Sequence, residues 1–263
     1  MYALHIIDNN EQDSSNSKTA KKILEKAAVI AASTDNHLHE LLRYDLNIVN
    51  GISNVVKENR ISDLILAVQG KKGISDSFYG HLTEGVLMQC NTTTLIYKSS
   101  QPLSTIKRHL VVVPENAEKE SGFPFWILKV WNMSRNSGTK LVFYANPQTL
   151  SVIRDIHKKH PMPCDFVEFM DWNDLLIIAR DVRQDDNLIF IMSRKDQPSY
   201  HKNMRHVPTY LNQYFQTTSF ILIYPMQIGL TAEGKDANNS SVLNSVLDID
   251  EIGQNIARLF RQK

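Results

Sequence analysis

Residues 64–86 read LILAVQGKKGISDSFYGHLTEGV, and this order of an apolar run, a glycine-containing loop and a helical pattern decides the fold class. The apolar run, 64–68, is typical of a strand buried in a parallel sheet. Gly70 and Gly73 open the loop that follows. Glycines between a strand and a helix N-terminus allow backbone N–H groups to approach an anion. The stretch therefore predicts an α/β unit with a candidate phosphate-binding loop.

Strand and helix patterns alternate along the rest of the chain. In the first half we expect strands at 4–8, 38–45, 63–68 and 92–98 and helices at 18–34, 47–59 and 77–90. In the second half we expect strands at 109–114, 140–145, 165–171, 187–192 and 217–225 and helices at 122–135, 146–160, 172–184 and 201–215, the last interrupted near Pro208. This alternation predicts a mostly parallel sheet with right-handed crossovers.

The two halves repeat each other. The recurring pairs of stretches are 64–68 with 188–192, 39–45 with 165–171, and 92–97 with 217–224. Three matches in the same order favour a duplicated α/β unit over chance. The predicted domains are residues 1–103, residues 104–226, and a linker with a C-terminal amphipathic helix at 227–263. We expect that helix to pack on the second domain, with docking to a partner as the alternative.

Composition narrows the possible functions. The chain has 263 residues, of which 42% are apolar, and a formal net charge of +1. A charge near zero does not favour nucleic acid as a partner. Cys90 and Cys164 stand far apart without CxxC spacing, so we expect reduced, buried thiols. No apolar run approaches the ~18 residues of a membrane span and no signal peptide is visible, so we expect the chain itself to be soluble.

Several stretches resemble the universal stress protein fold. They are LHIID (4–8), FYGHLTEGVL (78–87) and TTTLIYK (92–98), which are similar to a strand, the helix start after the glycine loop, and the last strand of that fold. The resemblance implies two Rossmann-like units. It also implies that strand 92–97 meets strand 217–224 edge to edge, which would hide two sheet edges.

SDSFYGHLTEGVL (75–87) resembles a narrower group, the tandem stress-protein regions that follow the membrane domain of bacterial cation/proton antiporters. This resemblance implies the cytoplasmic C-terminal region of a Na+/H+ antiporter, on the cytoplasmic side of the inner membrane. Its partners would be a transmembrane antiporter domain, upstream in the same polypeptide, and a second copy in a homodimer. The function we expect is non-enzymatic regulation of ion transport.

One departure from the resemblance concerns the first unit. The second unit has a first strand and helix at 109–135, and the first unit has no counterpart. In the stress-protein fold that strand is central, so the first unit should have a hole in its sheet. We expect either that the chain is cut from a longer one or that a neighbouring element fills the hole.

The glycine loop departs from the nucleotide-binding pattern Gly-x2-Gly-x9-Gly-[Ser/Thr] of the stress proteins. The candidate ligand-binding residues are Gly70, Lys71, Lys72, Gly73, Gly80 and His81. The spacing from Gly73 to Gly80 is six residues rather than nine, and His81 replaces the hydroxyl residue. In the second unit the equivalent loop, 193–203, has no glycine, and Pro114 and Glu115 stand where binding members usually carry an Asp.

We therefore expect no bound cofactor. The alternative is a stand-alone tandem stress protein that binds ATP or another adenine nucleotide, and an enzyme of the wider nucleotide-binding α/β class is a third reading. No catalytic motif is visible, and we expect no metal site. The aromatic cluster of Phe123, Phe125, Trp126 and Trp131 is expected to pack in the core or at a domain interface rather than to form a ligand platform. Four carboxylates are interpreted as helix caps and turns, namely Asp171, Asp174, Asp185 and Asp186.

Overall fold

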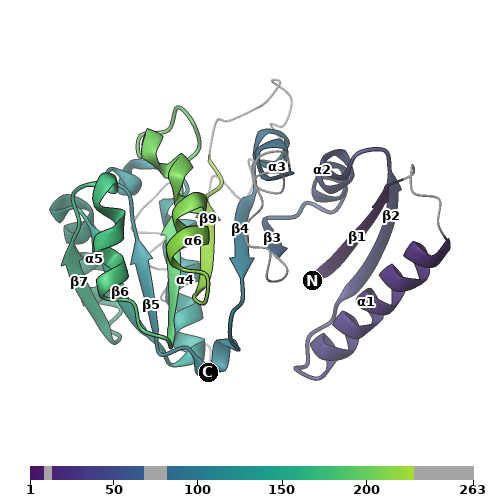
Figure 1. Cartoon of the computed structure of the whole chain (residues 1–263), viewed down its shortest axis with the longest axis horizontal. Coiled ribbons are helices and arrows are strands. Elements are labelled where there is room, and N and C mark those ends of the chain that lie inside the picture. The colour runs from purple at the N-terminus through teal and green to yellow at the C-terminus, as the bar shows by residue number, and fades with distance from the viewer. Residues whose placement is uncertain (9–13, 68–81, 228–263) are drawn as a thin grey trace. The chain divides into compact units, whose positions relative to one another are not determined.

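The computed structural model describes residues 1–8, 14–67 and 82–227 (Figure 1). Its packing forms two compact units. The first unit contains β1 (Tyr2–Asp8), α1 (Ser14–Ala32), β2 (His39–Asp45), α2 (Ile48–Glu58) and α3 (Glu84–Gln89). None of the described helices is long and apolar enough to cross a membrane.

The first unit is built on two parallel strands. β1 and β2 form a sheet of their own, in which Leu4 lies opposite Leu41, and α1 packs along it (Figure 1). α2 begins after Asn47, whose side chain accepts a hydrogen bond from the Val49 amide at 2.8 Å. Gly51 allows α2 to approach β1, because a Cβ there would lie 2.7 Å from Ile6 Cδ1.

The second unit is built on a seven-stranded sheet. Its strands are β3 (Asp63–Ala67), β4 (Thr93–Lys98), β5 (Arg108–Val112), β6 (Lys140–Ala145), β7 (Cys164–Glu168), β8 (Asp186–Ile191) and β9 (Ser219–Tyr224). Their order is β3-β4-β9-β8-β5-β6-β7. Every neighbouring pair is parallel except β4 and β9, which run antiparallel with Ile96 opposite Leu222. The predicted edge-to-edge pairing of these two strands is confirmed.

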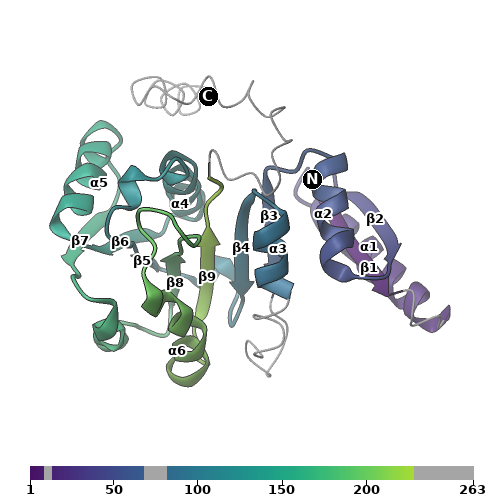
Figure 2. The same ribbon diagram turned by 90° about the horizontal axis from the view of Figure 1, so that it is seen from above.

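Helices cover both faces of this sheet. They are η2 (Leu103–Thr105), η3 (Ala117–Lys119), α4 (Phe123–Ser137), α5 (Pro147–Lys159), η4 (Trp172–Arg180), η5 (Lys202–His206) and α6 (Val207–Tyr214). Figure 2 shows α4 and α5 on one face and α6 on the other. The core under α4 contains buried Trp126, Trp131 and Phe143, so the predicted core position of the aromatic cluster is confirmed.

Most predicted elements are present, with shifted ends. β6 spans the predicted residues, and α5 begins as predicted after Asn146, whose Oδ1 accepts from the Thr149 amide at 2.8 Å. The helix predicted at 172–184 is present but shorter, because η4 is a 3-10 helix that ends at Arg180. Asp186 closes a turn as predicted, since its amide donates to the Arg183 carbonyl at 3.2 Å and its Oδ2 accepts from the Arg183 amide at 2.7 Å. It also begins β8 and is completely buried, which was not predicted.

Packing divides the chain differently from the predicted repeat boundaries, which stay a prediction. β3 and β4 belong to the second unit because β4 pairs with β9. Gln227, at the start of the predicted linker, is fully buried. The predicted C-terminal helix at 249–260 lies outside the described residues. Among the described strands, β1 and β2 form a sheet separate from that of β3 and β4, and the first half has no counterpart of β5.

Candidate functional site

The strand order of the second unit defines a switch point between β5 and β8. From β5 the chain proceeds outward to β6 and β7, and it then returns to β8 and β9 on the other side. Ligands of open parallel sheets bind outside the carboxyl ends of the strands at such a point. The candidate functional site is therefore the space beyond Val112 of β5 and Ile191 of β8.

A buried carboxylate, that of Glu120, occupies this position. Its side chain lies between the loop after β5 and the loop after β8 and is 5% exposed. Glu120 Oε1 accepts hydrogen bonds from Ser193 Oγ at 2.6 Å, from the Ser199 amide at 3.2 Å and from Ser199 Oγ. Glu120 Oε2 accepts from Gln227 Nε2. These four hydrogen bonds satisfy the buried carboxylate.

The chain segment after β9 closes the site from another side. Gln227 Oε1 accepts from Ser121 Oγ at 3.1 Å, and the Gln227 amide donates to Asn91 Oδ1 at 2.9 Å. A Cβ on Gly122 would lie 2.4 Å from the Met226 carbonyl oxygen and 2.5 Å from Pro225 Cβ. The start of α4, where the backbone of this fold would meet a phosphate, is thus covered by the chain itself.

Arg194, in the loop after β8, connects this loop to the segments just before β4 and just after β9. Its guanidinium is buried and donates from Nη2 to the Thr92 carbonyl at 2.9 Å and from Nε to the Pro225 carbonyl at 3.2 Å. A guanidinium in the ligand crevice of an α/β sheet could bind a phosphate. These two hydrogen bonds instead go to backbone carbonyls of the chain's own packed segments.

The side chains of the closed site hold together the segments that follow β5, β8 and β9. Glu120 places a negative charge beside the N-terminus of α4, where the helix dipole favours an anion. The donors that could hold a ligand phosphate, those of Ser193, Ser199 and Gln227, already donate to Glu120. A phosphate would have to displace a hydrogen-bonded carboxylate of the same charge sign, which disfavours conventional nucleotide binding in the second unit.

Gly70, Lys71, Lys72, Gly73, Gly80 and His81 lie outside the described residues. Glu115, predicted at the Asp position of binding members, is exposed, and Pro114 is buried. Sequence reasoning missed Glu120. The signal that could have found it is the paired loss of glycine and gain of Ser193 and Ser199 in the loop after β8.

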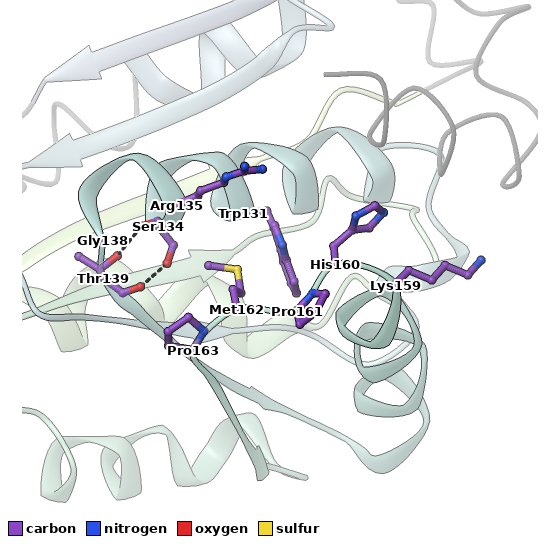
Figure 3. A pocket seen from close by; sticks show the side chains of 10 residues that line it. All are labelled: Trp131, Ser134, Arg135, Gly138, Thr139, Lys159, His160, Pro161, Met162 and Pro163. Atoms are coloured by element: carbon purple, nitrogen blue, oxygen red, sulfur yellow. Dashed lines mark hydrogen bonds between the residues drawn. The ribbon is translucent and has the colours of Figure 1, made fainter. Parts of the chain in front are cut away.

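A shallow depression of about 440 Å³ lies at the opposite ends of the strands (Figure 3). Its walls are the C-terminal turns of α4 and α5 and the segment before β7, and its lining residues are Trp131, Ser134, Arg135, Gly138, Thr139, Lys159, His160, Pro161, Met162 and Pro163. Burial and the neighbouring charges of Lys159 and Arg135 lower the pKa of His160. Cations at helix C-termini are explained by the helix dipole.

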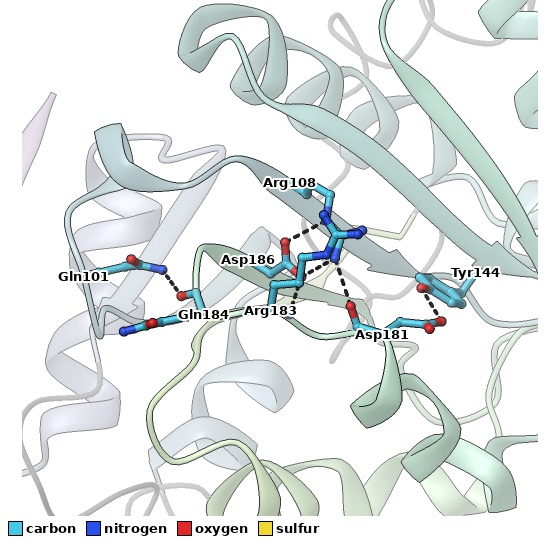
Figure 4. A network of polar contacts seen from close by, with 7 residues as sticks. All are labelled: Gln101, Arg108, Tyr144, Asp181, Arg183, Gln184 and Asp186. Atoms are coloured by element: carbon cyan, nitrogen blue, oxygen red, sulfur yellow. Dashed lines mark hydrogen bonds and ion pairs between the residues drawn. The ribbon is translucent and has the colours of Figure 1, made fainter.

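A second polar network fixes the amino ends of β5 and β8 (Figure 4). Arg108 donates from Nε to Asp186 Oδ1 at 2.8 Å and from Nη2 to Asp186 Oδ2 at 2.6 Å. The same Nη2 donates to the Asp181 carbonyl at 2.9 Å, and Tyr144 OH donates to Asp181 Oδ2 at 3.0 Å. Burial and the bond to Asp181 raise the pKa of Tyr144. This network is a structural clamp at the end of the sheet remote from the switch point.

His109 and Asn187 follow that clamp as register partners in β5 and β8. Asn187 Nδ2 lies 3.1 Å from His109 Nδ1, and burial lowers the pKa of His109 to about 4. Among the described residues, His109 Nε2 and Asn187 Oδ1 have no hydrogen-bond partner. Within residues 1–8, 14–67 and 82–227 no cluster of three metal-ligating side chains occurs. The expectation of no metal site stays a prediction.

Comparison with solved structures identifies the architecture. A universal stress protein from Archaeoglobus fulgidus matches with a TM-score of 0.56 and 11% identity, over 86% of this chain and 85% of that chain. The fold is that of the universal stress proteins. A protein of unknown function from Pseudomonas aeruginosa matches with a TM-score of 0.55 and 9% identity, over 100% of this chain and 86% of that chain.

The same stress-protein fold occurs in a transport protein. The cytoplasmic domain of a prokaryotic cation chloride cotransporter matches with a TM-score of 0.50 and 12% identity, over 84% of this chain and 83% of that chain. No family model and no curated protein sequence matches the chain. At these identities the likenesses establish the fold.

Proposed function

We propose that this chain is a non-enzymatic regulatory region of a membrane cation transporter, and specifically of a cation/proton antiporter of the Na+/H+ type. The transmembrane part lies upstream in the same polypeptide, and the region works on the cytoplasmic side of the inner membrane. It acts through packing between its own parts or with a second copy, without a bound cofactor.

The observation that carries the proposal is the closure of the switch-point site by Glu120. In the second unit, hydrogen-bonded side chains of the chain itself fill the ligand crevice of the stress-protein fold. Such a fold would act through contacts between its own parts or with other proteins rather than through a bound ligand. The cytoplasmic domain of the cation chloride cotransporter has a similar fold, which supports a role beside a transporter. The resemblance of residues 75–87 to antiporter regions favours proton exchange over other transport.

The second candidate is a stand-alone stress protein that binds ATP or another adenine nucleotide through the loop of the first half. The residues of that loop, Gly70 to His81, lie outside the described residues. Titration calorimetry with ATP separates the two. We expect no binding up to about 1 mM, whereas micromolar binding that is lost in Gly73→Leu and Gly80→Leu would favour the stress protein.

Transport by the longer polypeptide tests the proposal itself. Inverted membrane vesicles would be assayed for cation-induced proton movement with the intact region, with Glu120→Leu and with the exposed Glu115→Gln as a control. We expect Glu120→Leu to shift the cation or pH dependence of transport while Glu115→Gln leaves it unchanged. Identical dependence in all three polypeptides would contradict the proposal.

A further inference from the structure

The strand order of the second half provides a template for the first half. In the second half the order is β9-β8-β5-β6-β7, and β5 pairs in parallel with both β8 and β6. In the first half β4 pairs in parallel with β3, and β1 pairs in parallel with β2. These pairs match β9-β8 and β6-β7 in chain order and direction. Among the described strands, none corresponds to β5.

The edge of β3 that does not face β4 is open among the described strands. β3 consists of apolar residues after Asp63, yet no residue in it is buried, and Ile65 is 66% exposed. Parallel strands of this composition are normally covered on both sides, and an open apolar edge is a template for further pairing. An apolar edge that is open among the described strands is suited to pairing with a further strand.

β1, considered by itself, shows the same deficiency. Its described partner is β2 on one side, and five of its residues, 2–6, are only partly buried or exposed. Its counterpart in the template, β6, has five of six residues buried. In the second half a single strand, β5, pairs with both of the corresponding strands.

We propose that the open edge of β3 binds one further parallel β-strand, followed by a helix, and that both belong to polypeptide on the N-terminal side of Tyr2. The strand has the character of β5, with about five apolar residues, and the helix has the character of α4. The source follows from connectivity, because β5 continues through α4 into β6, and β1 takes the place of β6. A helix entering β1 from such a strand makes the right-handed crossover that parallel strands require. The proposal does not depend on the transporter function.

The first test adds the missing element. A copy of residues 107–139, which include β5 and α4, is joined ahead of Met1, and amide hydrogen exchange is measured at 63–67. We expect exchange in β3 to slow by at least about tenfold while exchange in β8 stays unchanged. The control carries Leu110→Lys and Val112→Lys in the copy alone and should give no protection. Equal exchange in β3 with and without the intact copy would overturn the proposal.

Two further measurements fix the source of the strand. The same 107–139 segment added as a free peptide should protect β3 far less than the joined copy, and equal protection at equimolar peptide would overturn the same-chain source. In the chain as it stands, concentration-dependent protection of β3 together with a dimer mass in light scattering would show that a second copy covers the edge instead. Because a joined copy can fail to fold, exchange is also measured in the longer natural polypeptide, where an unprotected β3 would overturn the proposal.

Discussion

β3 and β8 have similar sequences but opposite environments. β3 reads DLILA and β8 reads DNLIFI, and each lies next to the last strand of its half. All six residues of β8 are buried, whereas none of the five in β3 is. One structural difference is that β8 also pairs with β5, whereas β3 pairs only with β4 among the described strands. An apolar run thus predicts a strand, but its burial depends on a neighbour that the run itself does not specify.

The largest expected difference between the two units is in the loss of stability when one ion pair of each is broken. Arg108→Met leaves Asp186 buried without its guanidinium, and we expect a loss of about 3–5 kcal/mol in the free energy of unfolding. Arg43→Met removes a pair with Glu58 of similar geometry at 2.6 Å, but that pair is exposed, and we expect almost no change.

Tryptophan fluorescence in urea reports on the second unit alone, because Trp126, Trp131 and Trp172 are the chain's three tryptophans and all lie there. It therefore measures the loss of stability caused by Arg108→Met. Amide hydrogen exchange of β2 measures the change in stability caused by Arg43→Met. Equal losses of stability for the two substitutions would show that burial does not determine how much each ion pair contributes.

Matched isoleucines test the comparison between β8 and β3 directly. Ile189→Ala removes a completely buried side chain and should lower the free energy of unfolding by about 2–5 kcal/mol. Ile65→Ala removes an exposed one and should change it by less than about 0.5 kcal/mol. Urea midpoints from tryptophan fluorescence measure both, since β3 and β8 share the second unit. A loss above about 1 kcal/mol for Ile65→Ala would mean that a neighbour already covers β3.

The buried His109 should make the second unit sensitive to acid. Its pKa is about 4 in the folded chain, below the ordinary 6.5, so protons bind the unfolded chain first as pH falls. Stability from this group is complete above pH 6.5 and is lost as pH falls toward 4, by about 3 kcal/mol in total. His109→Gln, which can still accept from Asn187, should reduce that pH dependence. An unchanged dependence in urea midpoints between pH 7 and pH 4 would contradict this role.

The smallest effect is expected for the ion pair between Lys129 Nζ and Asp63 Oδ1, at 2.9 Å, which links α4 to the start of β3. Both side chains are about one-third exposed, so Lys129→Met should cost at most about 1 kcal/mol, and less in high salt. The urea midpoint at low and high salt measures it. A larger, salt-insensitive loss would show that this contact anchors β3 more strongly than its exposure implies.

Much of the fold was predictable because it follows from local patterns. Alternating apolar strands and amphipathic helices, a proline after an asparagine cap at Asn146, and the repeat of the last strands indicate the architecture and the pairing of β4 with β9. The 3-10 form of η4 was not predictable, because apolar periodicity does not distinguish tight helical turns from an α-helix. The buried ion pair of Asp186 was not predictable, because its partner, Arg108, is 78 residues away in the sequence.

The candidate site was predictable only in outline. Damage to the nucleotide pattern was visible in the glycine-free loop after β8. Its replacement by Glu120 was not visible, because the partners come from segments that meet only after folding: Ser193 and Ser199 after β8 and Gln227 after β9. Hydrogen bonds across about 70 to 110 residues leave no local periodicity.

The most direct test of the regulatory account is the DNA sequence upstream of codon 1. The account predicts an open reading frame that continues backward through a helix and an apolar strand into several apolar spans of about 20 residues each. That result would supply both the transporter and the strand for the open edge of β3. An in-frame stop codon shortly before codon 1 would contradict the account, and nucleotide binding by a stand-alone stress protein would then be the function to test.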